Sequence, residues 1–426
     1  MSTFDKIIGY KDVKQELMRY ADILKNPEKY QKLGVTVPTG IMLIGKPGLG
    51  KSLMAKCFAE ESGCSTYIIR KNAPDGEFVN LIRETYAEAR ENAPAVVILD
   101  DLDKYANEDP DRCDAEEYVT VQACIDEHKG GGVFSLATVN EECYLPSSLK
   151  RSGRFDEIIR IEKPEGQEAR EIVAYYLKQK EIIGNIDIDE ICRIMEKMSC
   201  AEIENVINKA GIYAGYRNKK QIEQCDLIAA YLRTRFQAQD NTVSYDESEM
   251  KAVAVHEAGH AVVYEMLDPG SVSIVSVCPQ DGDEKGFIKL RSPEGYPYSK
   301  TLHDHRIMGT LGGKAASEVV SGEIDMGCYS DLHQAFEMVN EYVDSICAFG
   351  FDAYEWARVS DELLNKKEQL RTAELERFYH EAKRIIIENR AFLDAVVDAL
   401  LDHKTVTYRE MQELREKYAV VVKTAK

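Results

Sequence analysis

One eight-residue segment constrains the fold of this chain more than any other part of the sequence. Residues 45–52 read Gly-Lys-Pro-Gly-Leu-Gly-Lys-Ser, directly after an apolar run over 40–44 and before a stretch with helical spacing. The glycines Gly45, Gly48 and Gly50 let backbone N–H groups close around phosphate oxygens, and the N-terminus of the following helix adds its positive dipole. A strand, a glycine-rich loop and a helix in this order predict an α/β nucleotide-binding domain.

Three side chains predict how the nucleotide is held. Lys51 is expected to contact the β- and γ-phosphates, and Ser52 is expected to coordinate Mg²⁺. The apolar run 96–99 ends in Asp100, at the sheet edge where a second acid on the magnesium side is expected. We therefore expect ATP and magnesium as cofactors.

Two further residues are candidates for the ATPase chemistry. Asp101 follows the magnesium-side acid and is expected to polarise the attacking water. Asn140 ends the next apolar run, where it would orient that water. The alternative for Asn140 is a polar cap at the end of a strand.

The apolar runs before residue 163 alternate with helix-length segments, which predicts a parallel sheet with helices on both faces. The expected strands lie at 40–45, 95–100, 133–138 and 157–161. The predicted organisation is an α/β nucleotide-binding domain over 1–163, a helical lid over 164–236, a polar linker over 237–249 and a mainly helical domain over 250–426. Within the last domain we expect a strand-like insert over 272–290 and an antiparallel helix pair over 371–416.

Composition narrows the class of protein. The 426 residues include 54 Lys and Arg against 74 Asp and Glu, a net charge of −20. Such an acidic chain is not expected to bind nucleic acid. No apolar run reaches the roughly 18–20 residues that span a bilayer, so we expect no membrane segment in this chain. The 11 cysteines form no CxxC pair, which is typical of reduced thiols and predicts a cytoplasmic protein.

A second motif lies in a helical stretch over 248–267. Residues 256–260 read His-Glu-Ala-Gly-His. Positions i and i+4 of a helix share one face, so His256 and His260 can bind one zinc ion. Glu257 is then placed to act as general base in peptide hydrolysis.

The motif does not specify the third zinc ligand. Met266 stands where a longer form of this motif would supply a third histidine. Downstream candidates are Glu318, Asp325 and Asp331, and the spacing alone does not choose among them.

A third segment, 145–156, resembles the second region of homology of AAA ATPases. It reads Leu-Pro-Ser-Ser-Leu-Lys-Arg-Ser-Gly-Arg-Phe-Asp. In that family, the arginines that match Arg151 and Arg154 reach the γ-phosphate bound to a neighbouring subunit, where they stabilise developing charge. The alternative is a solvated basic turn.

An AAA module followed by this zinc motif resembles the FtsH family of ATP-dependent metalloproteases, from Phe4 to about Val420. Segments 31–34 and 312–318 also match. The resemblance implies that Asp331 is the third zinc ligand, that six copies form a ring and that unfolded proteins are the substrates. It also implies that 286–289 is an edge strand beside the zinc, where extended substrate would pair by β-addition. The alternative for Asp331 is an ordinary helix N-cap.

The sequence departs from the family at its start. Family members normally carry transmembrane helices ahead of the AAA module, whereas this sequence begins almost on it. Either the protein is a naturally soluble paralogue, or it is membrane-anchored by an N-terminal segment missing from this chain.

Two other departures concern the ATPase. The family has Asp-Glu where this chain has Asp100-Asp101, which sets the second carboxylate about 1.5 Å further from the water. Because about 1 Å of misplacement can cost about 100-fold in rate, we expect slow ATP hydrolysis. The aromatic pore loop of the family is not recognisable over 71–80, where Phe78 is either a shifted pore aromatic or a buried residue that begins the next helix.

The sequence thus predicts an ATP-dependent zinc metalloprotease that acts on unfolded proteins as a homo-oligomeric ring. One alternative is an ATP-dependent chaperone or remodelling factor with a mainly structural peptidase domain. Another is an ATP-independent peptidase that uses nucleotide only for assembly.

Overall fold

The computed structural model describes residues 2–72, 74–106, 115–180, 183–238, 246–278, 286–292, 299–323, 326–346, 348–349 and 360–420. The chain forms two compact units. The first comprises Met1–Ile183 and Lys197–Ile222, and the second comprises Gly184–Glu196 and Glu223–Lys426. The chain therefore passes between the units more than once. The boundaries predicted from the sequence for the lid and the linker stay predictions.

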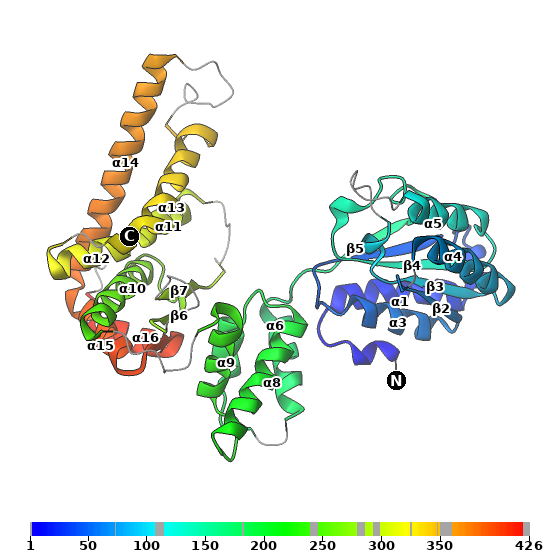
Figure 1. The fold of residues 1–426 in the computed structure, drawn as a ribbon, viewed down its shortest axis with the longest axis horizontal. Coiled ribbons are helices and arrows are strands. Elements are labelled where there is room, and N and C mark those ends of the chain that lie inside the picture. The colour runs from blue at the N-terminus through cyan, green and yellow to red at the C-terminus, as the bar shows by residue number, and fades with distance from the viewer. Residues whose placement is uncertain are drawn as a thin grey trace. The chain divides into compact units, whose positions relative to one another are not determined.

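The first unit is built on a five-stranded parallel sheet in the order β2-β3-β4-β1-β5. Its strands are β1 (Gly40–Ile44), β2 (Ser65–Ile69), β3 (Ala95–Leu99), β4 (Val133–Val139) and β5 (Glu157–Arg160). The helices α1 (Lys11–Lys25) and α3 (Lys51–Ser62) cover one face, and α4 (Asp75–Glu91) and α5 (Ala115–Glu127) cover the other (Figure 1). This arrangement confirms the predicted α/β fold.

The carboxyl ends of the central strands create the nucleotide edge of the sheet. β1 lies between β4 and β5, and β3 pairs with β4 in parallel. The chain leaves β1 into the glycine-rich loop, and the ends of β3 and β4 carry Asp100 and Asn140. Three segments that are distant in sequence therefore meet at one edge.

The strand β2 is missing from the sequence-based prediction. Only Ile69 of its five residues is buried, since β2 is an edge strand of this sheet. A strand with so little buried surface leaves no continuous apolar run or clean alternation to detect.

Other helices of this unit are α2 (Pro27–Gln31), α6 (Gly166–Lys178) and α8 (Cys200–Tyr216), with short helices η1 (Thr3–Lys6), η2 (Leu102–Lys104) and η3 (Glu142–Tyr144). Helix α8 begins with a capping box in which the Ser199 side chain accepts from the Glu202 N–H and the Glu202 carboxylate accepts from the Ser199 N–H. This reciprocal cap fixes where α8 starts.

The second unit is mainly helical, as predicted. It contains α7 (Ile188–Ile194), α9 (Gln224–Phe236), α10 (Glu247–Leu267), α11 (Lys300–Thr310), α12 (Gly312–Ser321) and α13 (Tyr329–Asn340), with η4 (Met326–Cys328) and η5 (Glu341–Ser345). A small antiparallel sheet has the order β7-β6-β8, formed by β6 (Val272–Ser276), β7 (Phe287–Leu290) and β8 (Thr405–Thr407).

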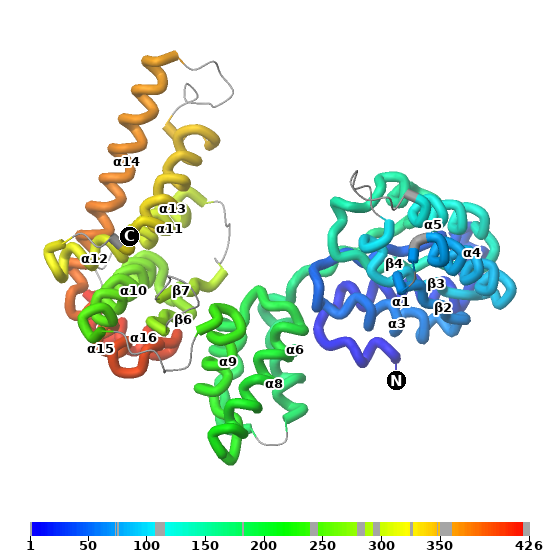
Figure 2. Tube along the Cα trace, viewed as in Figure 1, coloured from blue at the N-terminus to red at the C-terminus, as the bar shows by residue number. Residues whose placement is uncertain are grey.

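The C-terminal segment differs from the predicted helix pair. It forms three helices, α14 (Asp361–Glu388), α15 (Arg390–His403) and α16 (Tyr408–Tyr418), with β8 between the last two. In Figure 2 the C-terminal α15 lies beside α10, although more than 100 residues separate them in sequence. The three residues of β8 are too few for a periodic pattern, so only their pairing with β6 shows that they form a strand.

Helix α10 runs through the core of this unit and touches α12 with its backbone. Ala254, Ala258 and Ala261 of α10 are fully buried. A Cβ on Gly259 would lie 2.5 Å from the Gly312 carbonyl oxygen, so only glycine permits this approach. The contact brings the start of α12 against the histidine face of α10.

No helix within the described part of the chain combines the length and the apolarity required to cross a bilayer.

Candidate functional site

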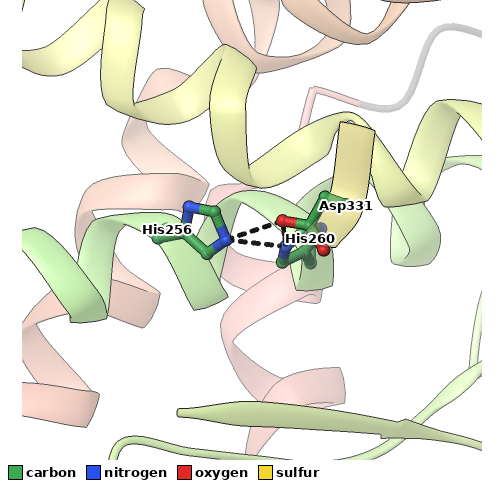
Figure 3. Close-up of side chains that lie close together, drawn as sticks. All are labelled: His256, His260 and Asp331. Atoms are coloured by element: carbon green, nitrogen blue, oxygen red, sulfur yellow. Dashed lines mark hydrogen bonds and ion pairs between the residues drawn. The ribbon is translucent and has the colours of Figure 1, made fainter. Parts of the chain in front are cut away.

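Three side chains from α10 and α13 converge on one point in the second unit (Figure 3). The Nε2 atoms of His256 and His260 lie 3.1 Å apart on one face of α10. The Oδ2 atom of Asp331 lies 2.9 Å from the His256 Nε2 and 3.2 Å from the His260 Nε2. The structure therefore brings together the two motif histidines and the aspartate that the family resemblance indicates.

The other candidates for the third position do not join this cluster. Glu318 lies on α12, where its carboxylate pairs with the Lys383 ammonium at 2.6 Å and accepts from the Tyr379 hydroxyl. Asp325 lies outside the described residues. Asp331 is in the first turn of α13, whose N-cap is Cys328, so the N-cap alternative for Asp331 does not hold.

The cluster fits a tetrahedral metal. Bonds of about 2.0–2.1 Å in a tetrahedral zinc site place neighbouring ligand atoms about 3.3 Å apart. The three donor atoms already lie within 2.9–3.2 Å of one another. A Cβ on Gly313 would lie 2.6 Å from the His260 Nε2 and 2.7 Å from the His256 Nε2. The absence of a side chain at Gly313 thus leaves room beside both nitrogens for a zinc ion.

Hydrogen bonds orient the three candidate ligands. The His260 Nδ1 donates to the Gly309 carbonyl oxygen over 2.8 Å, so its Nε2 is the atom that can bind a metal. Burial lowers the pKa of His260, but the hydrogen bond and charge of Asp331 and the charge of Glu257 outweigh it and raise the pKa to about 8. Burial raises the pKa of Asp331, but hydrogen bonds from both histidines hold it well below its usual range.

Glu257 lies directly against Gly286, the residue before the edge strand β7 of the small sheet. Its side chain is nearly buried, at 8% exposure. A Cβ on Gly286 would lie 2.6 Å from both the Cγ and an Oε atom of Glu257. Since β7 is an edge strand of the β7-β6-β8 sheet, the proposed base stands beside a strand to which an extended peptide can add.

At the nucleotide edge of the first unit, the glycine-rich loop and Asn140 hold the Lys51 side chain. Gly48 and Gly50 have φ angles of 81° and 88°, which other residues rarely adopt. The Lys51 ammonium donates to the carbonyl oxygens of Gly45 and Lys46 and to the Asn140 Oδ1, over 2.5, 2.9 and 2.8 Å. Gly48, Gly50 and Lys51 border a cavity of about 530 Å³.

Asp100 is fixed by three neighbours. Its Oδ1 accepts from the hydroxyls of Ser52 and Thr138, each over 2.8 Å. Its Oδ2 accepts from the Arg70 guanidinium, with 3.1 Å to Nε. Burial raises the pKa of Asp100, but these hydrogen bonds lower the pKa by more than burial raises it. The carboxylate therefore stays charged beside the predicted magnesium ligand Ser52.

Asp101 and Asn140, the two candidates for positioning the attacking water, contact one another. The Asn140 amide donates from Nδ2 to the Asp101 Oδ1 over 2.9 Å, and the Lys104 ammonium lies 2.6 Å from the Asp101 Oδ2. Asp101 has a φ of 55°, and its N–H donates to the Thr138 hydroxyl over 2.9 Å. Asn140 therefore links Lys51, the lysine expected to contact phosphate, to the acid proposed to polarise the water.

We expect Asp101→Glu to raise ATP turnover by about tenfold, because the added methylene moves the carboxylate toward the water. Turnover is measured at saturating ATP and magnesium in the wild type, in Asp101→Glu and in Asp12→Glu. Asp12 serves as the control because the same change is made there at an exposed position of α1. Turnover that is unchanged or lower in Asp101→Glu would contradict the explanation.

The two arginines of the predicted in-trans site differ in their surroundings. Arg154 forms a bidentate pair with Asp126, over 2.7 and 3.1 Å, and donates to the Ser148 carbonyl oxygen over 2.7 Å. Arg151 is exposed, and among the described residues its side chain has no ionic partner. Of the two, Arg151 is thus the one available to another chain.

Phe78 is a core residue of the first unit and not a shifted pore aromatic. Its side chain is 0% exposed on α4, and its ring packs edge-on against Tyr105 at 5.0 Å. The Lys71 ammonium lies over the Phe78 ring at 5.1 Å and pairs with the buried Glu117 at 2.8 Å. The Lys71 side chain therefore lies over the core at Phe78.

Sequence reasoning missed four contributors to these sites. Arg70 and Lys104 contact the two acids, and Gly309 and Gly313 contact the histidines. Arg70 directly follows β2, so recognition of that strand would have placed it at the nucleotide edge. Lys104 forms a local i,i+3 pair with Asp101, so its spacing was a usable signal. The contacts of Gly309 and Gly313 with the histidines depend on tertiary packing.

Comparisons with known proteins agree with this arrangement. The family described as "ATPase family associated with various cellular activities (AAA)" matches residues 41–163, and "Peptidase family M41" matches residues 243–414. "ATP-dependent zinc metalloprotease FtsH 3" of Petrotoga mobilis is 28% identical over 98% of this chain and 69% of its own length. "ATP-dependent zinc metalloprotease FtsH 2" of Thermoanaerobacter sp. is 28% identical over 97% of this chain and 83% of its own.

A third relative shows that coverage varies. "ATP-dependent zinc metalloprotease FtsH" of Sulfurovum sp. is 30% identical over 80% of this chain, which spans about half, 53%, of that protein. The two matched domains follow one another in the same order as the nucleotide site and the histidine cluster. The chain belongs to the FtsH-like family of AAA zinc metalloproteases.

Proposed function

We propose that this ATP-dependent zinc metalloprotease hydrolyses peptide bonds in unfolded or flexible proteins within a ring of six identical subunits. The observation that carries the proposal is the convergence of His256, His260 and Asp331 beside Glu257. A nucleotide site in the same chain supports the dependence on ATP. The acidic composition and the cysteine pattern favour a cytoplasmic enzyme that acts on proteins and not on nucleic acid.

The peptidase residues have separate tasks. His256, His260 and Asp331 would hold zinc, which supplies Lewis-acid polarisation of the scissile carbonyl. Glu257 accepts the proton of the attacking water and returns it to the leaving amine. The substrate pairs as an extended strand with β7, which places its backbone alongside Glu257.

The ATPase residues work at the edge of the first sheet. Lys51 and the loop glycines hold the phosphates, and Ser52 and Asp100 would hold the magnesium ion, which neutralises phosphate charge. Asn140 and Asp101 orient the attacking water. Arg151 completes the site of a neighbouring subunit, which is the reason that a ring is needed.

Casein degradation tests the peptidase assignment. We expect the wild type to bind zinc, measured by atomic absorption, and to degrade casein with ATP. Glu257→Gln should retain zinc but lose about 100- to 10,000-fold in rate, because the general base is gone. Glu337→Gln, which changes an exposed residue of α13, is the matched control and should remain active. Equal casein degradation by Glu257→Gln and the wild type would refute the protease assignment.

Lys51→Ala separates the remaining alternatives. We expect this variant to lose ATP binding and casein degradation together. Survival of peptide cleavage in an intact Lys51→Ala oligomer would favour an ATP-independent peptidase. Folding assistance by the wild type without zinc-dependent cleavage would favour a chaperone.

A further inference from the structure

A six-residue segment, 196–201, joins the two units and has a contact at each end. It follows α7 and leads into α8, and Met198 and Ser199 within it are 3% and 4% exposed. Lys197 is exposed and has a φ of 63°, in the left-handed region that non-glycine residues rarely adopt. An unfavourable backbone angle next to two buried residues marks a place where the surrounding structure imposes a conformation.

One end of this segment contacts the phosphate-binding loop. The Ala201 N–H donates to the Gly48 carbonyl oxygen over 3.1 Å. A Cβ on Gly48 would lie 2.9 Å from both the Ser199 hydroxyl oxygen and the Ala201 Cβ. A movement of Gly48 on nucleotide binding therefore displaces the residues at the start of α8. These contacts lie within the first unit.

The other end of the segment contacts the edge strand of the second unit. Lys289 of β7 donates from Nζ to the carbonyl oxygens of Ile194 and Glu196, with 3.1 Å to the latter. An ammonium group at these carbonyls also complements the negative end of α7. The Ser292 N–H donates to the Glu196 carboxylate over 2.9 Å.

The same strand reaches the proposed base. Gly286 precedes β7 and packs against the Glu257 side chain, while the Phe287 ring stacks on Phe236 of α9 at 3.7 Å. A shift of β7 along its axis therefore moves both the backbone offered to substrate and the wall of the Glu257 site. The covalent chain across Lys197 is the only further link that this route needs.

We propose that segment 196–201 and Lys289 form a relay by which nucleotide bound at Gly48 sets the position of β7 beside Glu257. This inference rests on the proposed function, because it gives a physical route for the ATP dependence of peptide cleavage. Lys289 is a positioning residue in this relay, and Lys197 holds the segment in the conformation that transmits the shift.

Two variants test the relay. Lys197→Gly keeps the left-handed backbone accessible but removes its rigidity, and Lys289→Met removes the ammonium group. We expect each to lower the ratio of fluorogenic-peptide cleavage rates in ATPγS and ADP by about three- to tenfold. Lys289→Arg, which retains N–H donors, should restore the ratio. The controls are Lys404→Gly, at a left-handed lysine with φ of 65°, and Lys300→Met, which breaks an exposed pair with Asp304.

Hydrogen exchange gives a readout that does not depend on cleavage. In the wild type, the amides of 287–290 should exchange at different rates in ATPγS and in ADP, and this difference should vanish in Lys197→Gly and Lys289→Met. If both variants keep the wild-type ratio of cleavage rates and the wild-type difference in exchange, the relay is refuted. If the zinc-loaded wild type cleaves no peptide, the proposed function fails, whereas the exchange difference still decides the relay.

Discussion

Gly313→Ala is expected to abolish zinc binding and with it all peptide cleavage, a loss of at least about 10,000-fold in rate. The added methyl carbon would lie 2.6 Å from the His260 Nε2 and 2.7 Å from the His256 Nε2, on the side where the metal must stand. Helix α12 packs backbone to backbone on α10 at Gly312 and Gly259, so withdrawing it to relieve the clash would break that packing. The methyl group therefore competes with the metal for one space.

Zinc content and casein degradation are measured together with ATP turnover. The ATPase site lies in the other unit, so ATP turnover should persist and show that the variant is folded. Gly215→Ala is the matched control, since Gly215 is also helical and has no neighbouring atom within 4 Å of the added Cβ. One zinc per chain in Gly313→Ala would show that the histidine cluster is not the metal site.

The zinc site illustrates what local sequence can and cannot predict. The spacing of His256 and His260 follows from helical periodicity alone, and the structure places both on one face of α10. Asp331 was indicated only by family resemblance, because its position depends on how α13 packs against α10. Gly313 lies in segment 312–318, which matches the family, but its place beside the histidines becomes visible only when its neighbours in space are known.

The fold was predictable where burial was continuous. β1, β3 and β4 are buried along their whole length, and each matched an apolar run. The edge strand β2 and the short strand β8 were missed, because partial burial in one and three-residue length in the other erase the period-two pattern.

The sequence left two roles open for Phe78, a pore aromatic or a core residue, for a related reason. An aromatic residue near a helix start has the same sequence pattern whether it faces a pore or a core. Only the packing of Phe78 against Tyr105 distinguishes the two. The position of an aromatic residue in the sequence is thus weaker evidence for its role than the burial of its side chain.

Arg151→Ala is expected to lower the kcat for ATP by about 1,000- to 100,000-fold, the range for loss of an arginine supplied by a neighbouring subunit. The structure supports this choice because Arg151 is exposed and unpaired within the described residues. Mixing Arg151→Ala subunits with inactive Lys51→Ala subunits should restore part of the turnover. Interfaces that combine an intact Lys51 with a neighbour's intact Arg151 form only in the mixture, so absence of restoration would contradict a role between subunits.

Arg154→Ala is expected to act differently, through its own chain. Its bidentate pair with Asp126 and its bond to the Ser148 carbonyl hold the turn that carries Arg151. Loss of the pair should lower the free energy of unfolding by about 1 kcal/mol, because Asp126 is half exposed. Asp126→Asn weakens the same pair without touching the arginine, so it should reproduce the effects of Arg154→Ala on urea unfolding and on turnover. If Asp126→Asn retains full turnover while Arg154→Ala loses it to the extent of Arg151→Ala, then Arg154 must leave Asp126 and reach the neighbouring nucleotide as well.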